Sequence, residues 1–93
     1  MKKNYKLIIP SQISNDIELS STAKLLTGEI FRLSTKEGYC FASNKYLADL
    51  MNIHETTSSK IISELKRKEI VKIFIDNNGR ARRIYLQSKD WWL

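Results

Sequence analysis

Three arginines near the C-terminal end of the chain have the residue type and spacing to contact phosphate groups. Arg80, Arg82 and Arg83 fall within four residues, directly after an Asn-Asn-Gly turn at positions 77–79. A guanidinium group beside a flexible turn can follow a nucleic-acid backbone or enter the minor groove of a duplex. We therefore expect these arginines to contact a polyanion.

A second set of polar side chains recurs at helical spacing upstream of the arginines. Thr56, Ser59, Lys60 and Ser63 fall on one side of a helical repeat. Their hydroxyls can donate or accept at base edges, and Lys60 can read a guanine or pair with a phosphate. Glu55 can accept from a cytosine amino group, although stabilisation of the helix dipole alone also explains it. The candidate set is completed by Thr57, Asn44 and Lys45.

Other polar residues have simpler interpretations. A solvated helix face is the alternative for the hydroxyls, but Ser and Thr are poor helix formers, so their concentration at exposed positions favours contact. Residues 66–68, Lys-Arg-Lys, are explained by dipole complement and solubility. His54, the only histidine, is interpreted as a turn or cap residue, with a phosphate contact as the alternative. Cys40 is interpreted as a small buried residue.

The charge balance favours an anionic partner. Sixteen Lys and Arg stand against ten Asp and Glu, which gives a formal net charge of +6 and a pI near 9.6. Each phosphate that such a protein neutralises releases condensed counterions. The excess leans toward the C-terminal part, because residues 1–53 hold seven basic and five acidic groups, whereas residues 54–93 hold nine and five.

The sequence lacks the patterns of an enzyme. It contains no glycine-rich phosphate loop, no cluster with metal-ligand spacing and no nucleophile with a base nearby, so we expect no catalytic residue, cofactor or metal. A chain of 93 residues suits one compact domain. One cysteine cannot form an intramolecular disulfide, and the apolar runs are too short for a signal peptide or a membrane span. A cytoplasmic location without membrane contact is expected.

Hydrophobic periodicity predicts an α+β domain. Helices are expected at residues 21–33, after a Ser20 or Ser21 cap, at 44–51, after a Ser43 cap, and from His54 or Glu55 to Lys68. The stretch 39–42 can form a brief strand. From Ile70 the period changes to two, and the Asp-Asn-Asn-Gly turn followed by a strand from Ala81 to Leu86 predicts a β-hairpin.

The domain is predicted to cover residues 19–87, preceded by an arm at 1–18 and followed by a tail at 88–93. Residues Tyr5 to Ile9 read as a short strand or an extended arm that Pro10 ends. Gly28 costs its helix about 1 kcal/mol relative to Ala, so we expect it to permit close packing of a neighbour. Trp91 and Trp92 can pack on the domain, mediate dimerisation or begin a further segment, and these alternatives stay open.

The residues between the second and third helices fit a helix-turn-helix. Two helices that cross steeply need a small residue at the crossing, a permissive backbone in the turn and an apolar residue after it. Ala48, Asn52 and Ile53 occupy these positions in order, and Leu47, Met51 and Ile61 supply the shared core. Ser58 stands where a Val or Ile is expected. The order of the elements then predicts a winged helix-turn-helix, a helical core with a C-terminal hairpin wing.

Four stretches carry a resemblance to a known family. They are Leu19-Ser-Ser-Thr-Ala-Lys-Leu-Leu, Gly38-Tyr-Cys-Phe-Ala-Ser-Asn-Lys-Tyr-Leu-Ala, Ile61-Ile-Ser-Glu-Leu-Lys-Arg-Lys and Gly79-Arg-Ala-Arg-Arg-Ile-Tyr. Over about residues 5–87 the chain resembles the N-terminal winged-helix domain of plasmid and phage replication initiators and replisome organisers of Gram-positive bacteria. It departs from that family at His54, where a Ser or Thr cap is usual, and at Glu69, where Gly is usual.

The resemblance implies a function in DNA binding. The third helix would enter the major groove of double-stranded DNA, and a homodimer would bind repeated or palindromic sites during replication initiation. The dimer contact is expected at Tyr5 to Ile9 and on the apolar face of the first helix. Two alternatives remain: a transcriptional repressor of the same fold, and an interaction module that recruits replication proteins.

Overall fold

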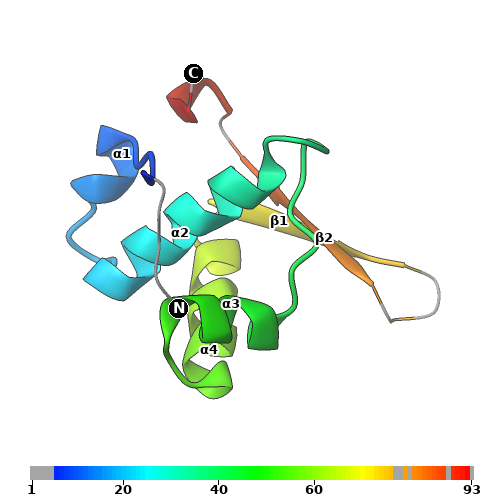
Figure 1. The fold of residues 1–93 in the computed structure, drawn as a ribbon. Helices are drawn as coiled ribbons and strands as arrows, with labels where there is room; N and C mark the ends of the chain where they lie inside the picture. Colours follow the sequence, from blue (N-terminus) through cyan, green and yellow to red (C-terminus); the bar gives the residue numbers. More distant parts are fainter. Residues whose placement is uncertain (1–5, 77–78, 80, 88, 93) are drawn as a thin grey trace.

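The structure, a computed structural model, describes residues 6–76, 79, 81–87 and 89–92. Its elements in chain order are α1 (Ser11–Ser14), α2 (Ser21–Ser34), α3 (Asn44–Met51), α4 (Glu55–Arg67), β1 (Val71–Ile75), β2 (Arg82–Leu86) and the 3₁₀ helix η1 (Lys89–Trp92). Helix α2 crosses the middle of the molecule, α3 and α4 lie together at one end, and the β1–β2 hairpin projects to one side (Figure 1).

Side-chain caps start two of the predicted helices. The hydroxyl of Ser20 accepts a hydrogen bond from the Ala23 N–H at 3.1 Å, and that of Ser43 accepts from the Tyr46 N–H at 3.0 Å. His54 occupies the N-cap position of α4, as predicted, but its side chain makes no capping hydrogen bond. The expected bounds of α2, α3 and α4 are confirmed to within one residue.

The turn between α3 and α4 has the predicted geometry. Asn52 adopts the left-handed conformation at φ 57° and ψ 47°, which Asn tolerates better than most residues. The chain then turns back, and the Ile53 N–H donates to the Ala48 carbonyl at 2.9 Å. Ala48 is 2% exposed, so a small side chain does fill the helix crossing.

Helix α4 ends on a second left-handed residue, at the position where the resembling family carries Gly. Glu69 has a φ of 61°. Around it the Ile70 N–H donates to the Leu65 carbonyl at 2.9 Å, and the Glu69 N–H donates to the Lys66 carbonyl at 3.0 Å. This is the hydrogen-bond pattern of a Schellman motif, which satisfies carbonyls at the end of a helix. A residue with a Cβ holds this conformation at a cost of about 1–2 kcal/mol.

The predicted hairpin is present, and a third segment joins it. Strands β1 and β2 pair antiparallel in the register Val71↔Leu86 to Ile75↔Arg82. Cys40 makes an isolated antiparallel bridge to Ile84, with N–H to carbonyl distances of 2.9 and 2.7 Å. The strand expected at 39–42 is thus reduced to one bridge. Residues 77 and 78 of the predicted turn, and Arg80 after it, lie outside the described residues.

The core lies between α2, α4 and the inner face of the hairpin. Cys40 is fully buried as expected, and burial raises the pKa of its thiol, which favours the neutral form. The largest side chains less than 2% exposed are apolar at most positions and include Ile13, Leu26, Ile30, Leu47, Leu65 and Ile84. The fold is therefore α+β, a winged helix-turn-helix, and the predicted fold class is confirmed.

The N-terminal arm packs on α2 without forming the suggested strand. Residues 6–10 have no regular structure, and Tyr5 lies outside the described residues. A Cβ on Gly28 would lie 3.1 Å from Ile9 Cγ1 and 3.4 Å from Leu7 Cβ, which confirms that this glycine permits a close neighbour. The short helix α1, which the sequence did not predict, follows and buries Ile13.

Ionic contacts connect the arm to the end of α4. Lys68 Nζ donates to a carboxylate oxygen of Glu18 and lies 3.3 Å from Asp16 Oδ2. The Glu18 N–H also donates to Asp16 at 2.9 Å, and this bond, together with Lys68, holds the pKa of Asp16 below its usual range.

One of the alternatives for the C-terminal tryptophans is supported. The Trp92 ring stacks on Phe31 of α2 with centroids 4.6 Å apart and planes inclined by 18°, and Trp92 is 8% exposed. Trp92 therefore packs on its own domain.

The dimer contact expected on the apolar face of α2 is wrong, because Ala23, Leu26 and Ile30 on that face are buried in the domain core. The dimer contact expected at residues 5–9 stays a prediction.

Ser58 is the buried position that departs from the expected apolar core. It is 0% exposed, and its hydroxyl oxygen has no hydrogen-bond partner among the described residues. A buried hydroxyl without a partner loses its hydration without compensation, which costs about 1–3 kcal/mol.

We predict that Glu69→Gly raises the free energy of unfolding by about 0.5–1 kcal/mol, since relief of the left-handed backbone exceeds the entropy that Gly adds to the unfolded state. Glu64→Gly, inside α4, is the matched control and should lower it by about 1 kcal/mol. Urea unfolding of both variants measures the difference. Equal destabilisation by the two changes would refute the argument from φ.

Ser58→Ala is predicted to raise the free energy of unfolding by about 1 kcal/mol or more, because it removes an unpaired buried hydroxyl and improves helix propensity. Ser63→Ala, on the exposed side of α4, serves as control, since it changes helix propensity alone, by roughly 0.5 kcal/mol. Thermal unfolding followed by circular dichroism compares them. A Ser58→Ala protein that melts below the parent would show that this hydroxyl is stabilising.

Candidate nucleic-acid interface

Helix α4 presents the predicted polar residues on its solvent side. Thr56, Lys60 and Ser63 are exposed, while Ile61 and Leu65 are buried on the opposite side. Thr57 and Ser59 are half-buried at the border between the two sides. The structure therefore places three of the predicted side chains together on one accessible stripe of the helix.

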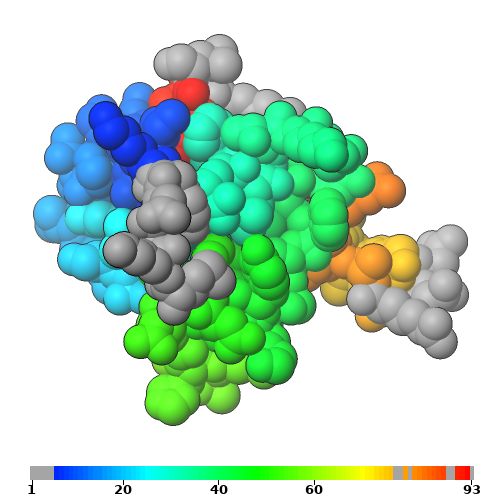
Figure 2. Space-filling view, viewed as in Figure 1, coloured from blue at the N-terminus to red at the C-terminus, as the bar shows by residue number. Residues whose placement is uncertain are grey.

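A recess separates the first turns of α3 and α4 from the hairpin. Its volume is about 410 Å³, and it is lined by Phe41, Ser43, Asn44, Glu55, Ile75, Gly79, Ala81 and Arg82. In Figure 2 the α3–α4 end and the hairpin project from the body in different directions, with open space between them. Three predicted residues far apart in the sequence, Asn44, Glu55 and Arg82, thus share one surface.

Arg82 has a structural contact at the edge of this recess. Its Nε and Nη2 atoms donate to the Ala42 carbonyl oxygen at 3.1 and 3.0 Å. Burial lowers the pKa of its guanidinium, although nearby Cys40 opposes the shift. Arg82 therefore holds the loop before α3 against β2, and only its remaining N–H groups can serve a phosphate.

Arg83 faces the other side of the hairpin, because successive side chains of a strand alternate between faces. Its guanidinium carbon lies 4.8 Å from the centroid of the Tyr39 ring. A hydrogen bond with Tyr85 raises the pKa of Arg83, and electrostatic interaction with Tyr39 and Tyr85 raises it further. The structure therefore separates Arg83 from the recess that Arg82 lines. Arg80 lies outside the described residues.

The two candidates on α3 differ in their environment. Lys45 is exposed and forms an ion pair with Asp49 one turn later, at 3.1 Å. Such exposed pairs are worth little and leave the cation accessible. Asn44 is half-buried, and its side-chain oxygen is buried without a hydrogen-bond partner among the described residues.

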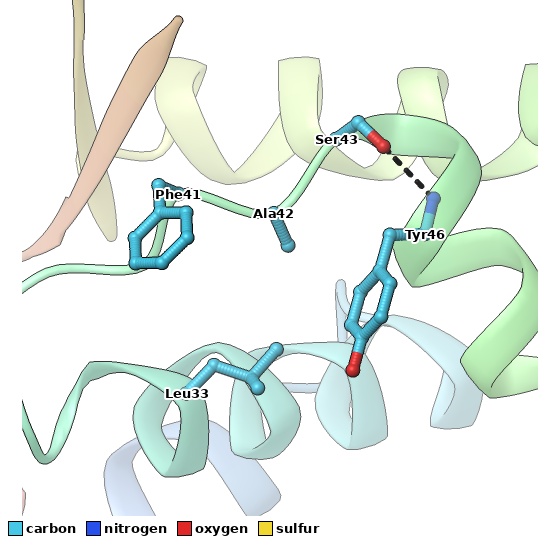
Figure 3. A pocket seen from close by; sticks show the side chains of 5 residues that line it. All are labelled: Leu33, Phe41, Ala42, Ser43 and Tyr46. Carbon is cyan, nitrogen blue, oxygen red and sulfur yellow. Dashed lines mark hydrogen bonds between the residues drawn. The ribbon is translucent and has the colours of Figure 1, made fainter.

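Exposed apolar residues near the recess were not predicted as part of a site. Phe41 and Ile75 are each 65% exposed, although their residue types favour burial. On the other side of the 41–43 loop, a second hollow of about 460 Å³ is lined by Leu33, Phe41, Ala42, Ser43 and Tyr46, whose side chains surround it in Figure 3. The sequence signal for this surface is the group Tyr39, Phe41 and Tyr46, which we assign from the sequence to a brief strand at 39–42 and to the family pattern but to no site.

Two other features, a metal site and a membrane-spanning helix, are absent from the described part of the chain. Within it, no group of three His, Cys, Asp or Glu side chains is placed to hold a metal ion. None of its helices is long and apolar enough to cross a membrane.

Comparisons with known proteins agree with this architecture. The chain matches the helix-turn-helix domain family over residues 18–71. The structure is similar to MepR, a transcription regulator of the Staphylococcus aureus multidrug efflux pump MepA, with a TM-score of 0.66 and 15% identity over 88% of this chain and 57% of MepR. MepR in a complex with DNA gives a TM-score of 0.65 and 14% identity over 88% and 64% of the two chains.

A more distant similarity is to the PcaV transcriptional regulator from Streptomyces coelicolor, with a TM-score of 0.58 and 16% identity over 85% of this chain and 55% of PcaV. No curated protein matched the sequence significantly. The chain spans a little over half the length of most of these solved structures, and at such identities they show the fold alone. The match over residues 18–71 covers more than half of the chain, which therefore belongs to the helix-turn-helix domain family.

Proposed function

We propose that this chain binds double-stranded DNA at specific sequences, with α4 in the major groove and the hairpin beside it. The observation that carries the proposal is one recess lined jointly by Asn44 of α3, Glu55 of α4 and Arg82 of the hairpin. The exposed stripe of α4 begins at the next residue, Thr56. The major groove of B-DNA admits an α-helix, and a positive net charge of +6 supplies attraction for phosphates.

Within this arrangement the stripe of α4 reads the bases. Thr56, Lys60 and Ser63 stand at the N-terminal and middle part of the helix, where recognition helices contact base edges. Lys60 can donate to a guanine, while the hydroxyls discriminate more weakly. Lys45 and Asn44, at the start of α3, are suited to position the protein on the backbone.

The biological setting has two candidates. The sequence resemblance favours replication initiation at a plasmid or phage origin, and the similarity of fold to MepR and PcaV favours a transcriptional regulator. Both would read DNA in the same way, and a homodimer on a two-fold symmetric site suits a module of this size. Mapping the bound sites in the host genome separates the two, since a regulator occupies promoters and an initiator an origin.

The first test selects bound duplexes from a random library and then titrates the enriched sequence by fluorescence anisotropy at two salt concentrations. Lys60→Ala should weaken binding about 5- to 100-fold, which corresponds to about 1–3 kcal/mol for a base contact. Lys36→Ala is the matched control, because it removes the same charge from an exposed loop residue away from the recess. Because salt screens a charge that lies far from the bound duplex, Lys36→Ala should change affinity less than about twofold.

Two results would count against the proposal. One is a library from which no sequence is enriched. The other is an equal loss of affinity in the Lys60→Ala and Lys36→Ala proteins, which would indicate that charge alone attracts the duplex.

A further inference from the structure

The outer face of the hairpin, turned away from the core, carries an alternating set of aromatic and cationic side chains. Lys72 and Phe74 of β1 stand opposite Tyr85 and Arg83 of β2 in the strand register. Tyr39, beside the Cys40 bridge, extends the set across a third segment. We call these five residues the outer hairpin face.

The rings of this face support one another and are not buried in the core. Phe74 meets Tyr85 edge-on, with centroids 5.5 Å apart and planes at 87°. Tyr39 meets Tyr85 at 5.5 Å and 45°. Phe74 stays 51% exposed, whereas the inward-facing Ile84 of the same sheet is fully buried. The contacts fix the orientation of the rings and leave part of their surface to solvent.

Each cation of the face lies over a ring. The Lys72 ammonium is 5.4 Å from the Phe74 centroid, and the Arg83 guanidinium carbon is 4.8 Å from the Tyr39 centroid. Beside them, toward the end of the hairpin, is a hollow of about 390 Å³ lined by Phe74, Ile75, Asp76, Ala81, Arg83 and Tyr85. Aromatic surface, positive charge and a hollow therefore occur together.

We propose that the outer hairpin face binds single-stranded DNA, with unpaired bases stacked on its rings and phosphates paired with Lys72 and Arg83. Aromatic side chains interleaved with cations on a small sheet are suited to unpaired bases, because every base offers a π face and a neighbouring phosphate. A paired duplex has its base faces already stacked and cannot use the rings. A second copy of the same face would oppose Lys72 and Arg83 with like charges.

This site is distinct from the proposed duplex site. Arg82, on the inner side of β2, borders the recess next to α4, whereas Arg83 belongs to the outer hairpin face. The hollows of the two sites share Ile75 and Ala81 near the end of the hairpin, but their arginines and aromatic rings differ. Substitution of an outer ring therefore tests the single-strand site separately from the duplex site.

The test uses the full chain and a fluorescein-labelled fifteen-nucleotide oligo(dT), titrated by anisotropy alongside a duplex of the same length. Phe74→Leu removes the ring and keeps an apolar side chain, while Phe74→Tyr keeps the ring. Phe74→Leu should weaken oligo(dT) binding about 5- to 100-fold, the range for loss of one base–ring stack. Phe74→Tyr should stay within about threefold of the parent, and duplex affinity should change less than twofold in both.

A second readout locates the strand directly. Oligo(dT) that carries 5-iododeoxyuridine, cross-linked by long-wavelength light and analysed by mass spectrometry, should label peptides with Tyr39, Phe74 or Tyr85. Labelling confined to α4 would overturn the proposal, as would unchanged oligo(dT) affinity in a folded Phe74→Leu protein. Oligo-glutamate that competes as well as unlabelled oligo(dT) would also overturn it and would identify the face as a site for acidic peptides.

Discussion

The main-chain bridge between Cys40 and Ile84 sets the relation between the helical and the β part of this protein. Both residues are fully buried, and their two hydrogen bonds satisfy backbone groups that would otherwise be unpaired inside the core. The bridge joins the segment before α3 to β2, the second strand of the hairpin, so α3, α4 and β1 lie in the stretch of chain between the two bridged residues. The Arg82 contact with Ala42 lies next to it and adds a side-chain link to the same junction.

From this junction the two faces of the hairpin acquire different surroundings. On the inner side, the chain from Phe41 to Asn44 brings the first turn of α3 toward β2, and the recess beside α4 results. On the outer side, Tyr39 is placed against Tyr85. A shift of the bridge by one residue would turn Tyr39 inward and Cys40 outward, because side-chain direction alternates along a strand. The register at Cys40 thus places Tyr39 where it meets Tyr85 and Arg83.

The elements that follow from local pattern were predictable from the sequence. Capping serines, the helical period of α4, the left-handed Asn52 and the period of two in the hairpin depend on neighbours only a few residues away, and the structure agrees with each. The site was predictable in part. The stripe of α4 followed from helical spacing, whereas Arg82 and Arg83, predicted from the sequence as one contacting set, are divided between the two faces of the hairpin. The Arg82 contact with Ala42, the stacking of Trp92 on Phe31 and the path of the arm depend on pairs distant in sequence, which no local pattern specifies.

The arm over Gly28 illustrates how such distant pairs constrain the chain. Ile9 and Leu7 occupy the space that a side chain at position 28 would need. A larger residue there has to be matched by a smaller one on the arm, or the arm has to leave the helix and uncover apolar surface. Positions 9 and 28 should therefore vary together among related sequences, as a compensating pair in which the acceptability of either residue depends on the other.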